Sequence, residues 1–159
     1  MKEIYASAAS NLRSGKPGNP LSPTVLAALS AIQTTRVCPE GSELFLEGQL
    51  PVGIYILYAG RVKLSVTSNH GQQVVLGTVL PGDILGLSAV VSGKCYEETA
   101  VAMIPSQIGF IKCKDFLSFM DHHPEAAFWV VQLLSDRVTT TLEQLSCLNK
   151  HTPSAAVRQ

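Results

Sequence analysis

Long apolar segments and metal-ligand patterns are both missing from this 159-residue chain. No apolar run approaches the ~18 residues that a membrane-spanning helix needs, and the N-terminus lacks the apolar core of a secretory signal. The four cysteines form neither a C-x-x-C pair nor a zinc or iron–sulfur spacing: Cys38, Cys95, Cys113 and Cys147. We therefore expect a cytoplasmic protein that crosses no membrane, binds no metal and keeps its cysteines as buried or half-buried thiols.

An excess of charge of either sign is absent as well. Twelve basic and twelve acidic residues give a formal net charge of zero. Binding to nucleic-acid phosphates needs a local surplus of Lys and Arg, so these residues predict no DNA-binding surface of their own. The hydrophobic fraction of 46% is enough for one domain with a real core and no disulfide support.

Helical patterns at the two ends flank a middle part made of short strands. Residues 1–20 are rich in Ser, Gly, Asn and Pro, which predicts a flexible arm. Ser22 as N-cap with Pro23 behind it predicts a short helix that ends near Gln33. From Thr34 the apolar period changes to two, and many short strands at this spacing indicate a closed roll or a sandwich. The expected strands are Thr35–Cys38, Leu44–Leu46, Gly53–Tyr58, Arg61–Thr67, Gln73–Leu80, Glu98–Ile104 and Gln107–Ile111, with Val62, Leu64 and Val66 on one face and Lys63, Ser65 and Thr67 on the other.

A long helix is predicted behind the strands, over residues 123–149, after a short helix at Lys114–Met120. Its apolar positions recur at alternating spacings of three and four, as in a coiled-coil seam. The seam consists of Val131, Leu134, Val138, Thr141, Leu145 and Leu148. Residues 150–159 form a polar tail.

Two interpretations of that seam remain open. The helix either packs on its own roll or pairs with the same helix of a second chain. Leu133, Leu142 and Cys147 give the helix a second apolar edge that is available to the roll. We therefore expect the seam to pair two chains into a homodimer.

The segment Pro81–Ala102, PGDILGLSAVVSGKCYEETAVA, is the candidate binding site. It opens on a Pro-Gly-Asp turn, continues as a short apolar stretch, and turns again at Ser92-Gly93-Lys94 before the next strand. An insert of this kind between two strands of a roll is a usual place for a pocket, because loop backbone supplies donors and the strands hold them still.

The order of these motifs resembles the sensor half of Crp/Fnr-type transcription regulators, the family of the cAMP receptor protein, from about Ser22 to Leu148. The first hairpins resemble the family's Gly-x-x-x-Phe-x-Glu-Gly turn, with Gly41, Phe45, Glu47 and Gly48 at the named positions. The strands around Tyr55 and Gly60 match the family's strand pattern, and LPGDILGLSAVVSG resembles its oxygen-sensor branch. His123-Pro124-Glu125 stands where the dimer helix of the family starts. The resemblance implies a mainly β fold, an antiparallel double-stranded β-helix (jelly roll) over residues 21–122. It also implies a short N-terminal helix, a phosphate-binding cassette and a long C-terminal dimerisation helix.

The cassette departs from the cyclic-nucleotide binders of that family. Their Gly-Glu binds the ribose and their Arg-Ser or Arg-Thr binds the phosphate, whereas here Leu87 follows Gly86 and Glu98 precedes Thr99. No Arg lies between Arg61 and Arg137. Loss of a bidentate Arg and gain of a like charge costs on the order of several kcal/mol, or about a thousandfold in affinity. We expect no tight binding of cAMP or cGMP to the pocket that the resemblance implies, formed by Gly86, Leu87, Ser88, Ala89, Glu98, Thr99, Ala100 and Thr141.

Other effectors and activities are judged on the same residues. The oxygen-sensing branch of the resembling family holds its iron–sulfur cluster with clustered N-terminal cysteines, and because no cysteine precedes Cys38 we expect no such cluster here. A haem sensor would need an axial ligand such as His70, a cysteine or the His122-His123 pair, which we interpret as a solvated turn. An organic acid, or no small effector, fits the apolar Leu87. Jelly-roll metalloenzymes need several converging His residues, and only His70 lies among the strands, so we predict no catalytic residues and no resident cofactor.

Two functions follow as expectations. The first is the sensor domain of a homodimeric regulator that contacts DNA through a helix-turn-helix domain outside this chain. The second is a structural dimerisation or protein-interaction module with a degenerate pocket, or a true cyclic-nucleotide domain that uses other contacts.

Overall fold

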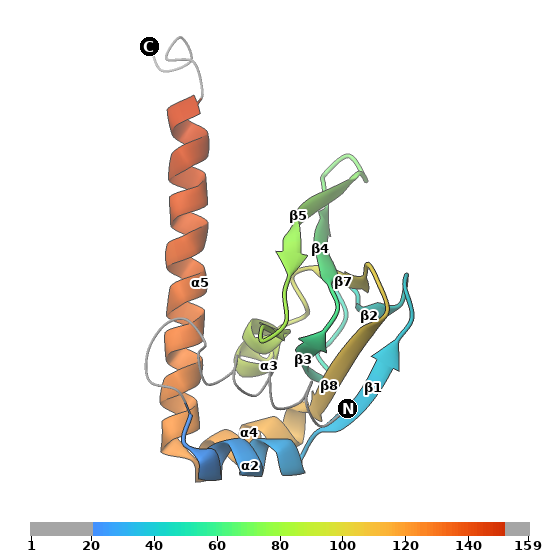
Figure 1. Ribbon diagram of the computed structural model, residues 1–159. Helices are drawn as coiled ribbons and strands as arrows, with labels where there is room; N and C mark the ends of the chain where they lie inside the picture. Colours follow the sequence, from blue (N-terminus) through green and yellow to red (C-terminus); the bar gives the residue numbers. More distant parts are fainter. Residues whose placement is uncertain (1–20, 152–159) are drawn as a thin grey trace.

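The computed structural model describes residues 21–151, and the predicted arm at 1–20 and most of the predicted tail lie outside them. Two four-stranded antiparallel sheets face each other, with strand orders β1-β8-β3-β6 and β2-β7-β4-β5. Helices gather at one end, and the last helix rises beside the roll (Figure 1). The predicted jelly roll with a short helix before it and a long helix behind it is confirmed.

The elements follow the sequence pattern closely, with two additions. The strands are β1 (Thr34–Cys38), β2 (Glu43–Phe45), β3 (Gly53–Ala59), β4 (Val62–Thr67), β5 (Gln73–Val79), β6 (Ile84–Leu85), β7 (Thr99–Ala102) and β8 (Ser106–Lys112). The helices are α2 (Pro23–Ala31), α3 (Leu87–Ser92), α4 (Cys113–His122) and α5 (Pro124–His151). The sequence analysis did not predict β6 or α3, because both are too short to show a period. Helix α5 includes the first two residues of the expected tail.

Strand β3 is buried on both faces because it lies between two hydrophobic clusters. Ile54 and Ile56 point toward the helices, and Tyr55 and Leu57 point into the roll. Successive side chains of a strand point to opposite faces, so one apolar run supplies both clusters. The β-roll and its helical base are thus joined through this strand.

The burial of side chains along β4 differs from the alternation predicted for Arg61–Thr67. Its pairing with β5 shifts between Leu64 and Ser65, as in a β-bulge. Val62 is fully buried as expected, but Ser65 is fully buried too, whereas Leu64 is only half-buried. The extra residue of this bulge is Leu76 on β5, because Leu64 pairs with Gly77 and Ser65 with Val75.

Helix α5 packs on the helical base of the molecule with its first three turns. Ala126, Trp129 and Val130 are buried with α2 and α4 in the helical cluster. Glu125 accepts hydrogen bonds from the backbone N–H and the hydroxyl of Ser22, so the N-terminus of α2 is attached to the first turn of α5. Beyond this base the helix continues past the level of α3 (Figure 1).

The cysteines differ partly from their predicted burial. Cys38 is buried and Cys113 is half-buried, but Cys95 and Cys147 are exposed. Burial raises the pKa of the Cys113 thiol, whose Sγ lies 3.1 Å from the carbonyl oxygen of Pro51. Among residues 21–151, no helix is long and apolar enough to cross a membrane.

Candidate functional site

The candidate pocket is built around the cassette, defined here as residues 84–98: strand β6, helix α3 and the loop that leads to β7. Gly86 joins β6 to α3 in the left-handed conformation, with φ of 78°. A Cβ at this position would lie 2.9 Å from Cε1 of Tyr96 and 3.2 Å from the carbonyl oxygen of Gly53. Glycine is therefore required both by the backbone conformation and by the close approach of Tyr96.

Tyr96 anchors the second half of the cassette to strand β3. Its hydroxyl donates to the carbonyl of Gly53 at 2.7 Å and accepts from the N–H groups of Val52 and Gly53. The ring stacks on Phe45, with centroids 4.2 Å apart. Burial raises the pKa of the Tyr96 hydroxyl, so it stays neutral as a hydrogen-bonding group.

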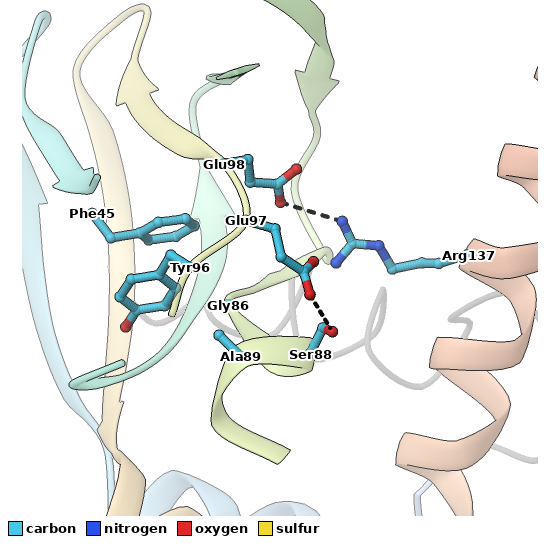
Figure 2. A pocket seen from close by; sticks show the side chains of 8 residues that line it. All are labelled: Phe45, Gly86, Ser88, Ala89, Tyr96, Glu97, Glu98 and Arg137. Carbon is cyan, nitrogen blue, oxygen red and sulfur yellow. Dashed lines mark hydrogen bonds and ion pairs between the residues drawn. The ribbon is translucent and has the colours of Figure 1, made fainter. Parts of the chain in front are cut away.

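The cavity beside this anchor is small. Its volume is about 10 Å³, which is room for about one water molecule. Figure 2 shows the side chains around it, which come from β2, the cassette and α5. The lining residues are Phe45, Gly86, Ser88, Ala89, Tyr96, Glu97, Glu98 and Arg137.

A hydrogen bond and an ion pair, each to a glutamate carboxylate, lie on the polar side of the cavity. The Ser88 hydroxyl donates to Glu97 at 3.0 Å. Nη2 of Arg137, from α5, lies 3.3 Å from Oε1 of Glu98, whose side chain is 14% exposed against 45% for the arginine (Figure 2). The cavity thus presents two carboxylates and one guanidinium, and one carboxylate is already paired with that guanidinium.

The structure brings together half of the predicted pocket. Gly86, Ser88, Ala89 and Glu98 line the cavity. The other four predicted members do not line it. Leu87 packs in the helical cluster and Ala100 lies inside the roll. The hydroxyl of Thr99 accepts a hydrogen bond from the backbone N–H of Glu47, and Thr141 is exposed on α5, where its hydroxyl donates to the carbonyl of Arg137.

Four lining residues were not predicted. Phe45 was identified only as part of a turn motif, and Tyr96 and Glu97 were left unassigned within the loop. Arg137 was named only as the next arginine after Arg61, and it lies 39 residues beyond Glu98 in the chain. The helical period gives the one sequence signal for Arg137, since it stands one turn before Thr141, which was predicted to be near the pocket.

The predicted seam is largely exposed on α5. Val131, Val138, Leu145 and Leu148 are 57%, 59%, 52% and 66% exposed, and Thr141 is exposed as well. Leu134 is half-buried against the helical cluster. Of the second apolar edge, Leu133 packs on that cluster, whereas Leu142 is 60% exposed.

The histidines that were considered as haem ligands have other roles. His70 is exposed in the turn between β4 and β5, as predicted. His122 and His123 do not form a solvated turn as a pair: each Nδ1 bonds to a carbonyl of α4, and His123 is half-buried against the ring of Phe119. Within the part of the chain that the structure describes, no three His, Cys, Asp or Glu residues are grouped to hold a metal ion.

Comparison with known proteins gives the same fold and a family. The cyclic AMP receptor protein of Thermus thermophilus is 27% identical over 122 residues, which are 77% of this chain and 56% of that protein. The catabolite activator protein structure from the same species has a TM-score of 0.75 at 24% identity, covering 87% of this chain and 63% of that one. The sensor domain of the transcriptional regulator DNR from Pseudomonas aeruginosa has a TM-score of 0.69 at 24% identity, covering 90% of this chain and 95% of that domain.

These similarities define what is shared. The chain spans only part of the first two proteins and nearly all of the isolated sensor domain. The prediction that the chain is not an enzyme agrees with the names of these three relatives, which are a receptor protein, an activator protein and a transcriptional regulator. The model of the cyclic nucleotide-binding domain matches residues 35–123, which is more than half of the chain. The chain therefore belongs to the cyclic nucleotide-binding domain family and is similar to the sensor domains of Crp/Fnr-type transcription regulators.

Proposed function

We propose that this chain is the effector-sensing and dimerisation domain of a cytoplasmic Crp/Fnr-type transcription regulator whose pocket does not bind cAMP tightly. The chain covers 56% and 63% of the two Thermus thermophilus relatives, which leaves length in such proteins for a further domain. DNA contact is assigned to a helix-turn-helix domain outside the residues given, since the chain has no net positive charge.

The polarity of the cavity carries this proposal. Glu97 and Glu98 both line it, and the lining includes a single cation, Arg137, which is paired with Glu98. A cyclic phosphate placed about 4 Å from an unpaired carboxylate meets a repulsion of about 4 kcal/mol at an effective dielectric constant of about 20. That energy corresponds to about a thousandfold in affinity, so tight binding of a cyclic nucleotide is disfavoured.

The size of the cavity supports the same conclusion. Sites for small molecules usually enclose about 300–1,000 Å³, whereas this cavity encloses about 10 Å³. The Phe45–Tyr96 stack occupies its apolar side. An effector of nucleotide size enters only if the cassette and α5 separate.

The exposed seam of α5 supports the proposed homodimer. A helix of 28 residues is about 42 Å long, and its base alone is buried in one chain. Contiguous exposed apolar surface of this kind usually marks an interface. Pairing two such helices along Val131, Val138, Leu145 and Leu148 covers the apolar surface that one chain leaves in water.

The first experiment measures thermal unfolding with and without cyclic nucleotides, together with equilibrium binding of a fluorescent cAMP analogue. A ligand at a hundred times its Kd adds about 2.7 kcal/mol of stability, which at this size is a Tm shift of about 5–10 °C. We expect no shift for the natural chain. A clear shift with cAMP would show that the cavity opens and that the charge argument is wrong.

A charge substitution gives the matched positive test. Glu98→Arg removes one of the two carboxylates, frees Arg137 from its ion pair and places a second guanidinium beside Gly86 and Ser88, so affinity for the cAMP analogue should rise at least tenfold. Glu40→Arg makes the same charge change at an exposed turn outside the cavity lining and should leave affinity unchanged. Leu87→Glu is unsuitable as a further test because the Leu87 side chain is only 2% exposed, within the helical cluster.

A ligand-free dimerisation module is the second candidate function, and the near absence of free volume in the cavity favours it. The two functions differ in one readout. A sensor domain responds to some member of a panel that includes 2-oxoglutarate, haem and cyclic di-GMP, whereas the structural module unfolds at one temperature with all of them.

A further inference from the structure

The contact between Arg137 and Glu98 joins two parts of the molecule that otherwise diverge. The fully buried part of α5 ends at Val130, and Arg137 lies seven residues, or about 10 Å, further along the helix axis. From there its guanidinium reaches across to Glu98, directly before β7 (Figure 2). Leu134, the last residue of α5 that packs on the helical cluster, lies three residues before Arg137, so the ion pair attaches α5 to the cassette about one turn beyond that cluster.

The signs of the two charges at this contact are opposite to those in the cyclic-nucleotide binders of the Crp/Fnr family. In a nucleotide-binding relative of this fold, an arginine next to the strand pairs with an anionic ligand. Here the strand side carries the carboxylate of Glu98, and the cation comes from α5 within the same chain. Without Arg137, the lining would hold Glu97 and Glu98 with no cation.

We propose that Arg137 is a built-in occupant of the pocket: its ion pair with Glu98 holds α5 against the cassette in place of a small effector, and opening of the cavity requires that pair to break. The inference rests on the proposed function and concerns the regulation of the same cavity. It makes the closed arrangement the resting state of the ligand-free chain. An effector or a partner acts by competing for Glu98 or Arg137.

Hydrogen exchange of the α5 backbone in the full chain tests this directly. Arg137→Gln and Glu98→Gln remove one charge each, and the amides of residues 134–141 should exchange about two- to fivefold faster, as expected for a partly exposed ion pair. The difference should shrink at high salt, because screening weakens the pair already in the natural chain.

Glu97→Gln is the matched control for this experiment. Glu97 lines the same cavity, loses the same charge, and keeps an oxygen that can accept from Ser88. Its exchange over residues 134–141 should equal that of the natural chain. The double variant Glu98→Arg with Arg137→Glu restores an ion pair with reversed polarity and should recover most of the protection that each single change loses.

The outcomes separate this proposal from the proposed function. Unchanged exchange in Arg137→Gln, or equal acceleration in Glu97→Gln, would overturn the role of the ion pair and leave the function proposal intact. Repeating the measurement in a Leu145→Glu background removes any protection that comes from dimerisation. If the chain is monomeric or binds cAMP tightly while Arg137→Gln still accelerates exchange, the function proposal fails and the ion-pair proposal stands.

Discussion

The substitution Leu145→Glu is the sharpest test of the α5 seam as a dimer interface. Leu145 is 52% exposed in the single chain and belongs to the seam with Val138 and Leu148. Complete burial of a leucine side chain stabilises by about 1.5–3 kcal/mol, so covering the exposed half contributes about 1 kcal/mol in each chain. Two symmetric copies give about 2 kcal/mol for the dimer.

Glutamate at this position adds a further cost to the lost burial. Two carboxylates would face each other across the symmetric interface, which raises the total cost to about 3 kcal/mol or more. The dimer Kd should therefore increase at least about a hundredfold. Sedimentation equilibrium over a concentration series of the natural chain and the variant measures both constants.

Ser146→Glu is the control, since Ser146 is exposed on α5 but lies outside the seam. It should leave the dimer Kd within about threefold of the natural value. Both variants should keep the helix content and the buried environment of Trp129, the single tryptophan, because neither position contacts the helical cluster. A natural chain that sediments as a monomer, or a Leu145→Glu variant with an unchanged Kd, would refute the seam.

Three further predictions concern the cassette and the roll. Gly86→Ala should lower the free energy of unfolding by about 2–3 kcal/mol in urea titrations. Gly93 is the control, because its φ is 71° and no atom lies within 4 Å of an added Cβ, so Gly93→Ala should cost only about 1 kcal/mol. Equal losses would argue against the close approach of Gly86 to Tyr96. Tyr96→Phe keeps the ring on Phe45 but leaves the backbone of Gly53 without its partner, so Tm should fall by about 5 °C in calorimetry, and an unchanged Tm would contradict the anchor. Burial, followed by the neighbouring Tyr96, raises the pKa of Tyr55 from 10.0 to about 12. The stabilisation from its neutral hydroxyl is therefore complete below pH 10 and is lost as the pH rises toward 12, by about 2–3 kcal/mol in total, and Tyr55→Phe should show less of this alkaline loss.

Local patterns in the sequence determined most of the fold. Ser22-Pro23 begins the first helix, alternating apolar residues form the strands, and His123-Pro124 precedes the long helix, all within a few residues of the predicted bounds. These features depend on neighbours in the chain, so the sequence alone shows them. The six-residue helix α3 and the two-residue strand β6 could not be predicted because each is shorter than the window that a period needs.

The pocket shows where sequence reasoning stopped. Gly86 and Glu98 were identified through the resemblance to the cassette of the family, and both line the cavity. Leu87 was predicted to be beside them, but the turn of α3 rotates its side chain into the helical cluster, since adjacent helical residues point about 100° apart. Simple alternation also failed on β4, where Ser65 is fully buried and Leu64 is only half-buried.

The sequence by itself determined that this is a cyclic-nucleotide-type roll with a long helix and a cassette that lacks the phosphate-binding arginine. Only the tertiary structure decided that Arg137 returns to that cassette from α5, and that Phe45 and Tyr96 close it. The physical reason is that a contact between residues 39 positions apart depends on the angle and rotation of a helix, which the packing of Trp129 and Val130 on the base determines. No local pattern carries that information.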